Sequence, residues 1–400
     1  MSRVGIYGGS FNPPHTGHIL AARELVERLE LDELLIVPAA NPPHKTLPAG
    51  SPSPEERFAL CQAAFSGVPR ARVCDLELKR QGMSYTVDTL TQLRRERPED
   101  ELILVMGSDM LLSFRSWYQP ERILALAALA VVRRDESPST WEKVAAECQA
   151  LRRERGARIL IVENRCVTVS STTVRRLLAM KAPYCLDPRT EGMILEKGWY
   201  LTGADLKNLP FEELKRVSLS LHDEKRRPHV EGVSDTALAL AEHWGADPED
   251  ARRAGILHDV TKALGPKEQL HICEKYAMMI PELYRQNPKL LHAKTGAVIA
   301  REVFGENQAV VQAINWHTTG RLGMSLLDEI IYIADYMEPN RCFPGVEILR
   351  KLVWTDMNAA MFQGLDQSVT LLQKQGRVID PESLEAWRYY QNVTERSQTT

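Results

Sequence analysis

The sequence lacks a cysteine pattern of the kind that forms a disulfide framework. Its seven cysteines, spread over 400 residues, are odd in number and contain no C-x-x-C pair. Small disulfide-stabilised proteins usually carry an even, closely spaced set. We therefore expect reduced thiols and a cytoplasmic protein.

Long hydrophobic runs are also missing. The longest purely apolar run, 123–132, has ten residues and is closed by Arg133. Crossing a bilayer takes about 20 residues, so we expect a buried element and no membrane partner. Met1 leads almost directly into a strand-like run at 4–7, and we expect no signal peptide.

An excess of charge of either sign is absent too. Lys and Arg number 50 against 53 Asp and Glu, a net charge of −3. No overall basic field attracts nucleic acid, so phosphate binding must come from local groups. A hydrophobic content of 44% is ordinary for a globular chain, and 400 residues exceed what one core usually organises. Two domains are expected.

Short apolar runs alternate with helical patterns in the first half. The strand candidates are 4–7, 34–37, 73–76, 102–106, 129–132 and 159–162. Continuous rather than alternating apolar runs are typical of strands that are covered on both faces. The sequence therefore predicts a doubly wound, Rossmann-like parallel sheet with helices between the strands.

The pattern changes near residue 200. From Phe211 onward only helical stretches follow one another, and Asp247-Pro248 is a cap and first position for a helix that continues to Leu257. The predicted organisation is an α/β domain over 1–202, a linker over 203–210, an all-helical domain over 211–390 and a frayed tail over 391–400.

The first candidate site is the segment 8–18, which reads GGSFNPPHTGH. A glycine turn between a strand and a helix presents backbone N–H groups to phosphate. His15 and His18 would share one face at the start of a helix near Thr16 and donate to phosphate oxygens. The alternative is two surface histidines in a loop.

This segment resembles the signature of the nucleotidylyltransferase superfamily. The segment 169–175, VSSTTVR, resembles the partner motif S-S-T-x-[IV]-R. Its hydroxyls are expected to open a helix over Thr173–Met180 and to hold the triphosphate, with Arg175 adding charge. A plain helix cap would explain one hydroxyl but not the arginine.

Within that superfamily, residues 1–202 are most similar to nicotinate-nucleotide adenylyltransferases. The likeness is carried by PPHK at 42–45, SYTVDT at 84–89, and GSD at 107–109 followed by Trp117-Tyr118. It implies magnesium-dependent adenylyl transfer from ATP to nicotinate mononucleotide, which gives nicotinate adenine dinucleotide and pyrophosphate for NAD biosynthesis. Asn12 and Ser10 are small departures from the family pattern. Another substrate, such as phosphopantetheine, is an alternative that His15 and the Trp117 segment oppose.

The resemblance implies a role for each matching residue. The catalytic set is His15, His18 and Arg175; the ATP-binding set is Gly8, Gly9, Ser10, Phe11, Gly107, Asp109, Ser171 and Thr172; and the nicotinate mononucleotide-binding set is Lys45, Thr86, Trp117 and Tyr118.

The second candidate site consists of widely spaced histidines and aspartates. They are His229, His258, Asp259, His292, His317 and Asp335. Asp335 lies within the otherwise apolar run 330–337, where a carboxylate is costly without a partner or a metal. Taken one at a time, the aspartate could instead belong to a buried ion pair, and a histidine could be a hydrogen-bonded core residue. The six side chains together suit iron, manganese, cobalt or zinc better than calcium.

The order H…HD…H…H…D resembles the HD-domain metal-dependent phosphohydrolases. The segments 291–293, 317–320 and 334–341 resemble the YqeK-type family, over residues 209–390. That family cleaves diadenosine tetraphosphate symmetrically into two ADP. The resemblance implies one metal held by His229, His258, Asp259 and Asp335, and a second held by Asp259, His292 and His317. Iron is the metal that it suggests, with manganese as the alternative.

Two further charged residues are candidates for this site. Lys262, one turn after Asp259, and Arg341 could bind the polyphosphate, with solvated charges as an equal alternative, and Asp259 and Lys262 are the catalytic candidates. Pro228 departs from the family pattern, but proline is tolerated at a helix start, so we expect a helix to begin there.

The leading hypothesis is therefore a bifunctional enzyme that makes nicotinate adenine dinucleotide and hydrolyses diadenosine tetraphosphate. The alternative makes the second half a non-catalytic nucleotide sensor. The expected partners are small nucleotides, not nucleic acid. The sequence leaves the oligomeric state open, a homo-oligomer included.

Overall fold

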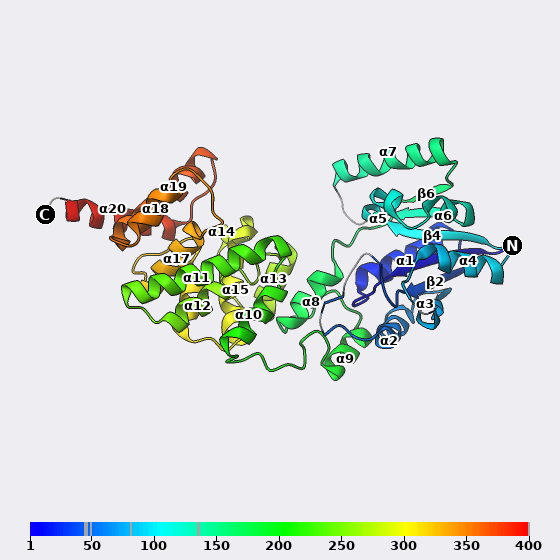
Figure 1. Ribbon diagram of the computed structural model, residues 1–400, viewed down its shortest axis with the longest axis horizontal. Helices are drawn as coiled ribbons and strands as arrows, with labels where there is room; N and C mark the ends of the chain where they lie inside the picture. The colour runs from blue at the N-terminus through cyan, green and yellow to red at the C-terminus, as the bar shows by residue number, and fades with distance from the viewer. Residues whose placement is uncertain (44–46, 49, 81, 134–136, 399–400) are drawn as a thin grey trace. The chain divides into compact units, whose positions relative to one another are not determined.

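The computed structural model describes residues 1–400 except 44–46, 49, 81, 134–136 and 399–400 (Figure 1). The chain divides into two compact units, Met1–Ala204 and Asp205–Thr400. Each unit is described by itself. None of the described helices is long and apolar enough to cross a membrane.

The N-terminal unit is built on one six-stranded sheet, in the order β3-β2-β1-β4-β5-β6. The strands are β1 (Arg3–Gly9), β2 (Glu33–Pro38), β3 (Ala71–Val73), β4 (Glu101–Gly107), β5 (Ala128–Val132) and β6 (Ile159–Val162). Every neighbouring pair is parallel. The predicted doubly wound parallel sheet is confirmed, and the strand order reverses direction between β1 and β4.

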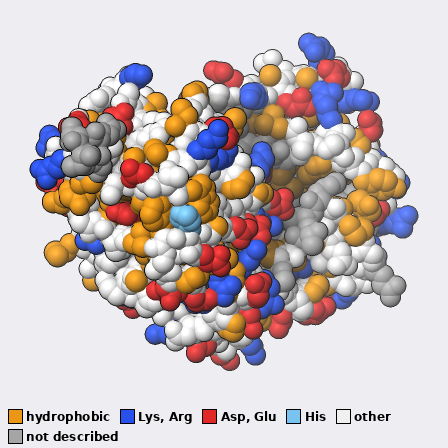
Figure 2. All heavy atoms as spheres, turned by 60° about the vertical axis from the view of Figure 1, so that its left-hand side comes forward, with side chains coloured by type: hydrophobic (Ala, Val, Ile, Leu, Met, Phe, Trp, Pro, Cys, Tyr) orange, Lys and Arg blue, Asp and Glu red, His pale blue; other side chains and the backbone are white. Residues whose placement is uncertain are grey.

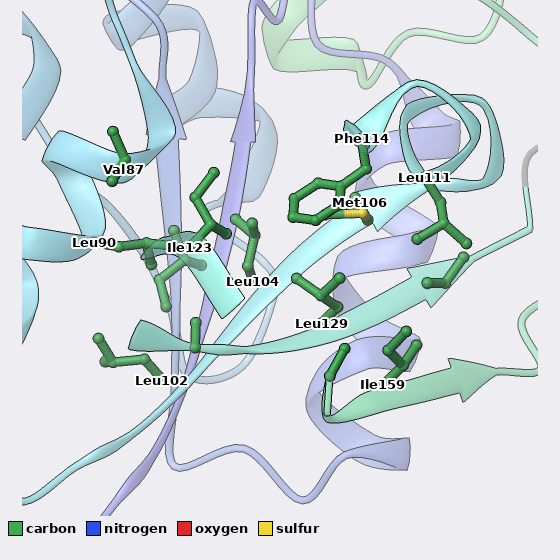
Figure 3. Close-up of a cluster of buried hydrophobic side chains, with 14 of the residues drawn as sticks. Val87, Leu90, Leu102, Leu104, Met106, Leu111, Phe114, Ile123, Leu129 and Ile159 are labelled. Carbon is green, nitrogen blue, oxygen red and sulfur yellow. The ribbon is translucent and has the colours of Figure 1, made fainter. Parts of the chain in front are cut away.

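Helices connect these strands and cover both faces of the sheet. They are α1 (Thr16–Arg28), α2 (Pro54–Phe65), α3 (Leu76–Lys79), α4 (Thr86–Glu96), α5 (Ser108–Leu112), η1 (Phe114–Ser116), α6 (Pro120–Leu126), α7 (Pro138–Arg155), α8 (Ser171–Ala179) and α9 (Pro188–Lys197). Figure 3 shows one of the two resulting cores, where Leu104 and Leu129 of the sheet face Phe114 and Ile123. Because both faces are buried, the strands are apolar almost without interruption.

Three element boundaries differ from the predictions. The strand expected at 73–76 lies at Ala71–Val73, because only these residues pair with β2, and Leu76 begins α3. The apolar run 123–132 is two elements, since α6 ends at Leu126 and β5 begins at Ala128. Helix α8 begins at Ser171 rather than Thr173, because the Ser170 hydroxyl accepts the N–H of Thr173 and caps it.

All regular secondary structure in the described part of the C-terminal unit is helical, as predicted. Its helices are α10 (Phe211–Ser220), η2 (Glu224–Arg226), α11 (Arg227–Trp244), α12 (Pro248–Leu257), α13 (Pro266–Lys275), α14 (Glu282–Gln286), η3 (Pro288–Leu290), α15 (Leu291–Glu302), α16 (Gln308–Trp316), α17 (Leu326–Met337), α18 (Val346–Leu352), α19 (Met357–Lys374) and α20 (Pro381–Gln398). Asp247 caps α12 by accepting the N–H of Asp250. Pro228 lies in the first turn of α11, where its missing N–H has no intrahelical partner to lose.

The frayed tail expected at 391–400 is not found over residues 391–398, because α20 continues to Gln398, and residues 399–400 lie outside the described part of the chain. Ala386, Tyr390 and Thr394 recur every four residues and are buried, so the last helix keeps one face against the unit. The Tyr390 hydroxyl also donates to Glu329 at 2.6 Å.

Charges of both signs are mixed on the surface that Figure 2 shows. Among the described residues in this view, Lys and Arg side chains lie between Asp and Glu side chains rather than in a field of one sign. Exposed large hydrophobic side chains include Met279, Leu322 and Ile348 of the C-terminal unit.

Candidate active sites

The glycine-rich turn of the N-terminal unit lies at the point where the strand order reverses. Gly8 and Gly9 end β1, and Gly107 ends β4. The two strands are paired up to Tyr7 and Val105, so the loops that leave them start at the same level of the sheet. Ligands of doubly wound folds bind at this edge.

His15 and His18 come together at the start of α1. His15 is the residue before the helix and His18 is its third residue. Their ring centroids are 3.7 Å apart with an interplanar angle of 33°. The His18 Nδ1 accepts the backbone N–H of His15 at 3.2 Å, and the edge of Phe11 contacts the His18 ring. Two imidazoles therefore lie where the helix dipole favours an anion.

The two signature segments contact each other although they are far apart in sequence. Arg175 donates from Nη1 to the carbonyl of Asn12 at 2.6 Å and from Nη2 to the Thr172 hydroxyl at 3.0 Å. The Ser171 hydroxyl donates to the carbonyl of Pro13 at 2.9 Å. Ser171 and Arg175 thus fix the loop that precedes the histidines.

The remaining residues assigned to ATP differ in whether the side chain or only the backbone is accessible to a nucleotide. The Phe11 side chain is buried against Phe65, so only its backbone is available to a nucleotide. The Ser10 carbonyl accepts a side-chain hydrogen bond from Arg57. Asp109 is exposed in the first turn of α5, directly after Gly107.

The residues assigned to nicotinate mononucleotide are brought together in part. Thr86 is the first residue of α4, and its neighbour Tyr85 packs on Tyr118 with ring centroids 4.7 Å apart. Trp117 is half-buried against Phe114. Lys45 lies outside the described residues.

Arg57 is a structural part of this site that the sequence motifs missed. Its side chain is fully buried on α2 and donates to three carbonyls, those of Ser10 (2.8 Å), Ala39 (2.7 Å) and Ala40 (3.0 Å). It therefore joins the glycine turn to the end of β2. The sequence feature that could have indicated this residue is an arginine on the apolar face of α2, one turn before Leu60.

We expect Arg57→Met to destabilise the N-terminal unit by about 3 kcal/mol or more, because it leaves buried carbonyls without donors. The affinity for ATP should fall as well, since the Ser10 carbonyl loses its anchor. Urea unfolding and ATP titration measure both effects. Arg23→Met is the control, because Arg23 is exposed and makes one long contact, at 3.4 Å, to Gly67. Equal unfolding midpoints for the two variants would contradict the anchoring role.

The histidines and aspartates of the C-terminal unit converge from five helices. They lie in α11 (His229), directly after α12 (His258 and Asp259), in α15 (His292), directly after α16 (His317) and in α17 (Asp335). Two overlapping groups could each hold a metal ion: His229, His258 and Asp335, and His258, Asp259 and His317. The structure therefore brings all six predicted metal ligands to one centre.

Asp259 lies between two sets of ligands. Its Oδ2 is 3.3 Å from the His258 Nε2 and 3.8 Å from the His229 Nε2. Its Oδ1 is 3.3 Å from the His292 Nε2 and 3.5 Å from the His317 Nε2. The two carboxylate oxygens thus face different histidine pairs.

Asp335 completes the first of these sets. Its Oδ1 is 3.1 Å from the His229 Nε2 and 3.8 Å from the His258 Nε2. On the other side of the centre, the Nε2 atoms of His292 and His317 are 3.2 Å apart. Two adjacent groups of inward-facing donor atoms result.

Each histidine is oriented through its other ring nitrogen. The Nδ1 atoms of His258, His292 and His317 contact the carbonyls of Gly255 (2.7 Å), Lys289 (2.6 Å) and Ile314 (2.7 Å), and the Nδ1 of His229 contacts the Glu338 carboxylate (3.0 Å). Such acceptors hold the proton on Nδ1 and leave the lone pair of Nε2 toward the centre. Buried Glu338 lies within the motif segment 334–341, but the sequence analysis gave it no role.

The protonation states of Asp259 and His317 suit metal binding, whereas burial of His258 is outweighed by Asp259 and Asp335, which raise its pKa. Burial opposes ionisation of Asp259, but His258, His292 and His317 outweigh it and hold the pKa of that carboxyl well below its usual value. Burial lowers the pKa of His317 to about 4. Carboxylate and neutral imidazole are the forms that ligate metal ions. This donor set fits iron, manganese, cobalt or zinc.

Three cationic side chains surround the centre. Arg341 donates to the Asp335 Oδ1 at 2.6 Å, and the Lys262 Nζ is 2.9 Å from the His292 Nε2. Arg226, which the motifs missed, donates from Nε to the Asp259 Oδ2 at 2.8 Å. It lies one turn before His229 in sequence, a spacing that could have indicated it.

Gly255 sets the separation of the helices that present His229 and His258. A Cβ atom at Gly255 would lie 2.7 Å from the Cα of Ser234 in α11. We expect Gly255→Ala to push α12 from α11, with a destabilisation of about 1–3 kcal/mol and weaker metal retention. Thermal unfolding and elemental analysis measure these effects.

The control for this variant is Gly192→Ala in α9, where a Cβ meets nothing within 4 Å. It should raise stability by about 0.5–1 kcal/mol, because alanine favours a helix interior. Unchanged metal content and unchanged stability in Gly255→Ala would contradict the close-packing explanation.

Comparison with known proteins gives a family for each half. A cytidylyltransferase-like family model matches residues 6–177, and an HD domain model matches 226–340. A protein of Trichlorobacter lovleyi named "Probable nicotinate-nucleotide adenylyltransferase" is 38% identical over 211 residues, which cover 50% of this chain and 99% of the relative.

The C-terminal half has equally clear relatives. A symmetrical bis(5'-nucleosyl)-tetraphosphatase of Bacillus subtilis (strain 168) is 42% identical over 161 residues, covering 40% of this chain and 86% of the relative. One solved structure also matches this half: a predicted HD superfamily hydrolase involved in NAD metabolism from Clostridium acetobutylicum. Its sequence is 36% identical, the TM-score is 0.45, and the match covers 46% of this chain and 98% of the hydrolase chain. The chain therefore belongs to the nicotinate-nucleotide adenylyltransferase family over its N-terminal half and to the HD-domain symmetrical bis(5'-nucleosyl)-tetraphosphatase family over its C-terminal half.

Proposed function

We propose that the chain is a bifunctional enzyme with one active site in each unit. The N-terminal unit transfers the adenylyl group of ATP to nicotinate mononucleotide, and the C-terminal unit hydrolyses diadenosine tetraphosphate to two ADP. The observation that carries the second activity is Asp259, whose two oxygens face different histidine pairs. The first activity is supported by the His15–His18 pair at the reversal of strand order.

In the first reaction, the phosphate of the mononucleotide attacks the α-phosphorus of ATP and pyrophosphate leaves. His15, His18 and the N-terminus of α1 bind the phosphates and neutralise developing charge. Arg175 and Ser171 hold the loop in place, so the reacting groups are oriented before reaction. Magnesium, when bound, adds charge neutralisation on the triphosphate.

The nicotinate ring would bind near α4 and η1. Trp117 offers a stacking face, and backbone amides near Thr86 and Tyr118 would donate to the carboxylate. Gly107 and Asp109 would face the ATP ribose and phosphates, as would Gly8, Gly9, Ser10 and Thr172. Comparing nicotinate and nicotinamide mononucleotides as substrates tests this assignment, and preference for the amide would contradict it.

In the second reaction, His229, His258, Asp259 and Asp335 would hold one metal ion, and Asp259, His292 and His317 the second. Two such ions would supply an activated water and would neutralise phosphate oxygens. Iron is proposed, with manganese as the alternative. Lys262, Arg341 and Arg226 would bind the polyphosphate, because all three lie against the ligand side chains.

A nucleotide sensor remains the competing proposal for the C-terminal unit. A sensor needs to bind phosphate but not to activate water, so it has no need of two complete ligand sets. The outward hydrogen bonds that orient all four imidazoles support metal ligation, and the presence of two ligand sets favours catalysis.

The decisive experiment follows the phosphorus-containing products of the intact protein by ³¹P NMR. With ATP, nicotinate mononucleotide and magnesium, we expect nicotinate adenine dinucleotide and pyrophosphate. With iron or manganese and diadenosine tetraphosphate, we expect ADP as the only product. ATP plus AMP would contradict symmetrical cleavage. Bound metal without any hydrolysis would favour the sensor.

A further inference from the structure

A cavity of about 560 Å³ lies in the C-terminal unit, apart from the metal ligands. Its lining comes from the segment 278–284, from α15 and α16, and from the start of α20. The walls are largely apolar, with Ile280, Leu283, Leu291, Ala297, Val298 and Val311 among the lining residues. Small-molecule sites commonly have this size and character.

Of the two cationic residues in the lining, Lys294 and Arg301, Lys294 packs against aromatic rings. The Lys294 Nζ lies 3.4 Å from the centroid of the Trp316 ring and 5.7 Å from that of Tyr284. It donates to the carbonyl of Asn315 at 3.1 Å. Among the described residues this is its one hydrogen-bond acceptor, which leaves two N–H groups of the ammonium for a ligand.

The other charges of the lining restrict the ligand. Asp380 is buried and accepts the Tyr284 hydroxyl at 2.6 Å and the backbone N–H of Glu382. The Glu382 side chain and Arg301 also belong to the lining. The two cations and two carboxylates of the lining leave no excess positive charge to hold a polyphosphate, whereas a single negative charge can pair with the half-buried Lys294 ammonium.

We propose that this cavity binds a small apolar monocarboxylate, whose chain or ring fills the apolar space and whose carboxylate accepts from Lys294. The site is distinct from the metal centre. His292 and Lys294 are two positions apart on α15, about 200° around the helix, so the metal ligand and the cavity cation lie on different faces.

The site is nevertheless built on the helices that carry the second metal set. Leu291 and Lys294 are neighbours of His292 on α15, and Trp316 directly precedes His317. A ligand in the cavity therefore contacts the elements that position both histidines. The proposed binding does not depend on the proposed hydrolysis, so either can fail without the other.

The test uses calorimetric titration of the intact protein with octanoate, and with 1-octanol as the neutral compound of equal chain length. We expect one octanoate per chain. Lys294→Met should weaken octanoate binding by about tenfold or more but leave octanol binding unchanged, because only the charge contact is lost. Val298→Trp should weaken both, because a larger side chain at this half-buried lining position then takes up part of the cavity.

Lys267→Met is the matched control, since Lys267 is exposed on α13 outside the cavity. Circular dichroism and metal content confirm that each variant is folded. Octanoate that fails to saturate the wild-type protein would overturn the proposal. So would equal binding to Val298→Trp, or self-association of the chain that occupies the cavity in place of octanoate, detected by sedimentation.

Discussion

Asp259→Asn is expected to lower hydrolysis of diadenosine tetraphosphate by about 10³-fold or more, because one residue serves both proposed metal sites. An amide keeps the shape of the carboxylate but turns an N–H₂ donor toward one of the two histidine pairs. Whichever way the amide rotates, either His229 and His258 or His292 and His317 face the wrong group. Metal content should fall together with the activity.

The same molecules provide an internal control, since synthesis of nicotinate adenine dinucleotide should remain at the wild-type rate. Asp356→Asn is the matched substitution: Asp356 caps α19 by accepting the N–H of Ala359, and asparagine caps helices equally well. Steady-state rates of both reactions measure the effect. A hydrolysis rate within a few-fold of wild type for Asp259→Asn would rule out a bridging role.

His18→Ala should lower adenylyl transfer by about 10²–10³-fold, the range found when one preorganised donor to a transition-state oxyanion is removed. The reason is its place at the start of α1, with its ring 3.7 Å from that of His15. Hydrolysis by the C-terminal unit should not change. Single-turnover measurement of pyrophosphate release separates this chemical step from substrate binding.

The alanine variant also loses a helix-capping contact, because the His18 Nδ1 accepts the backbone N–H of His15. His18→Gln separates the loss of the cap from the loss of the imidazole, since glutamine at the third helical position can restore the capping hydrogen bond. We expect it to recover the stability of α1 but to remain slow in adenylyl transfer. Recovery of the rate in the glutamine variant would assign His18 to the helix start rather than to phosphate.

Residue patterns were sufficient for the fold class of both units. Strands β4 and β5 are apolar because both faces of the sheet are covered, so an uninterrupted apolar run indicated a buried parallel strand. The start of α12 followed from Asp247-Pro248, a local signal that needs no tertiary contact. The bounds of strand β3 were mispredicted because they depend on its pairing with β2. The tail was mispredicted because packing of Tyr390 keeps α20 helical there. Both contacts join parts of the chain that are distant in sequence.

The motifs also indicated most of the candidate site residues, since their chemistry requires particular side chains at particular spacings. They could not indicate the roles of Arg57 and Glu338, because Arg57 donates to backbone carbonyls and Glu338 contacts a histidine in distant parts of the chain. Nor could they show that the two oxygens of Asp259 face different histidine pairs. Such geometry depends on how helices cross, which a single sequence does not specify.

The most direct measurement is anomalous X-ray diffraction from crystals of the intact metal-loaded protein, with elemental analysis of the same preparation. We expect two anomalous peaks, one beside each oxygen of Asp259 and about 3.5–4 Å apart, and two metal ions per chain. A single peak, or metal bound away from Asp259, would contradict a two-metal phosphohydrolase in the C-terminal unit.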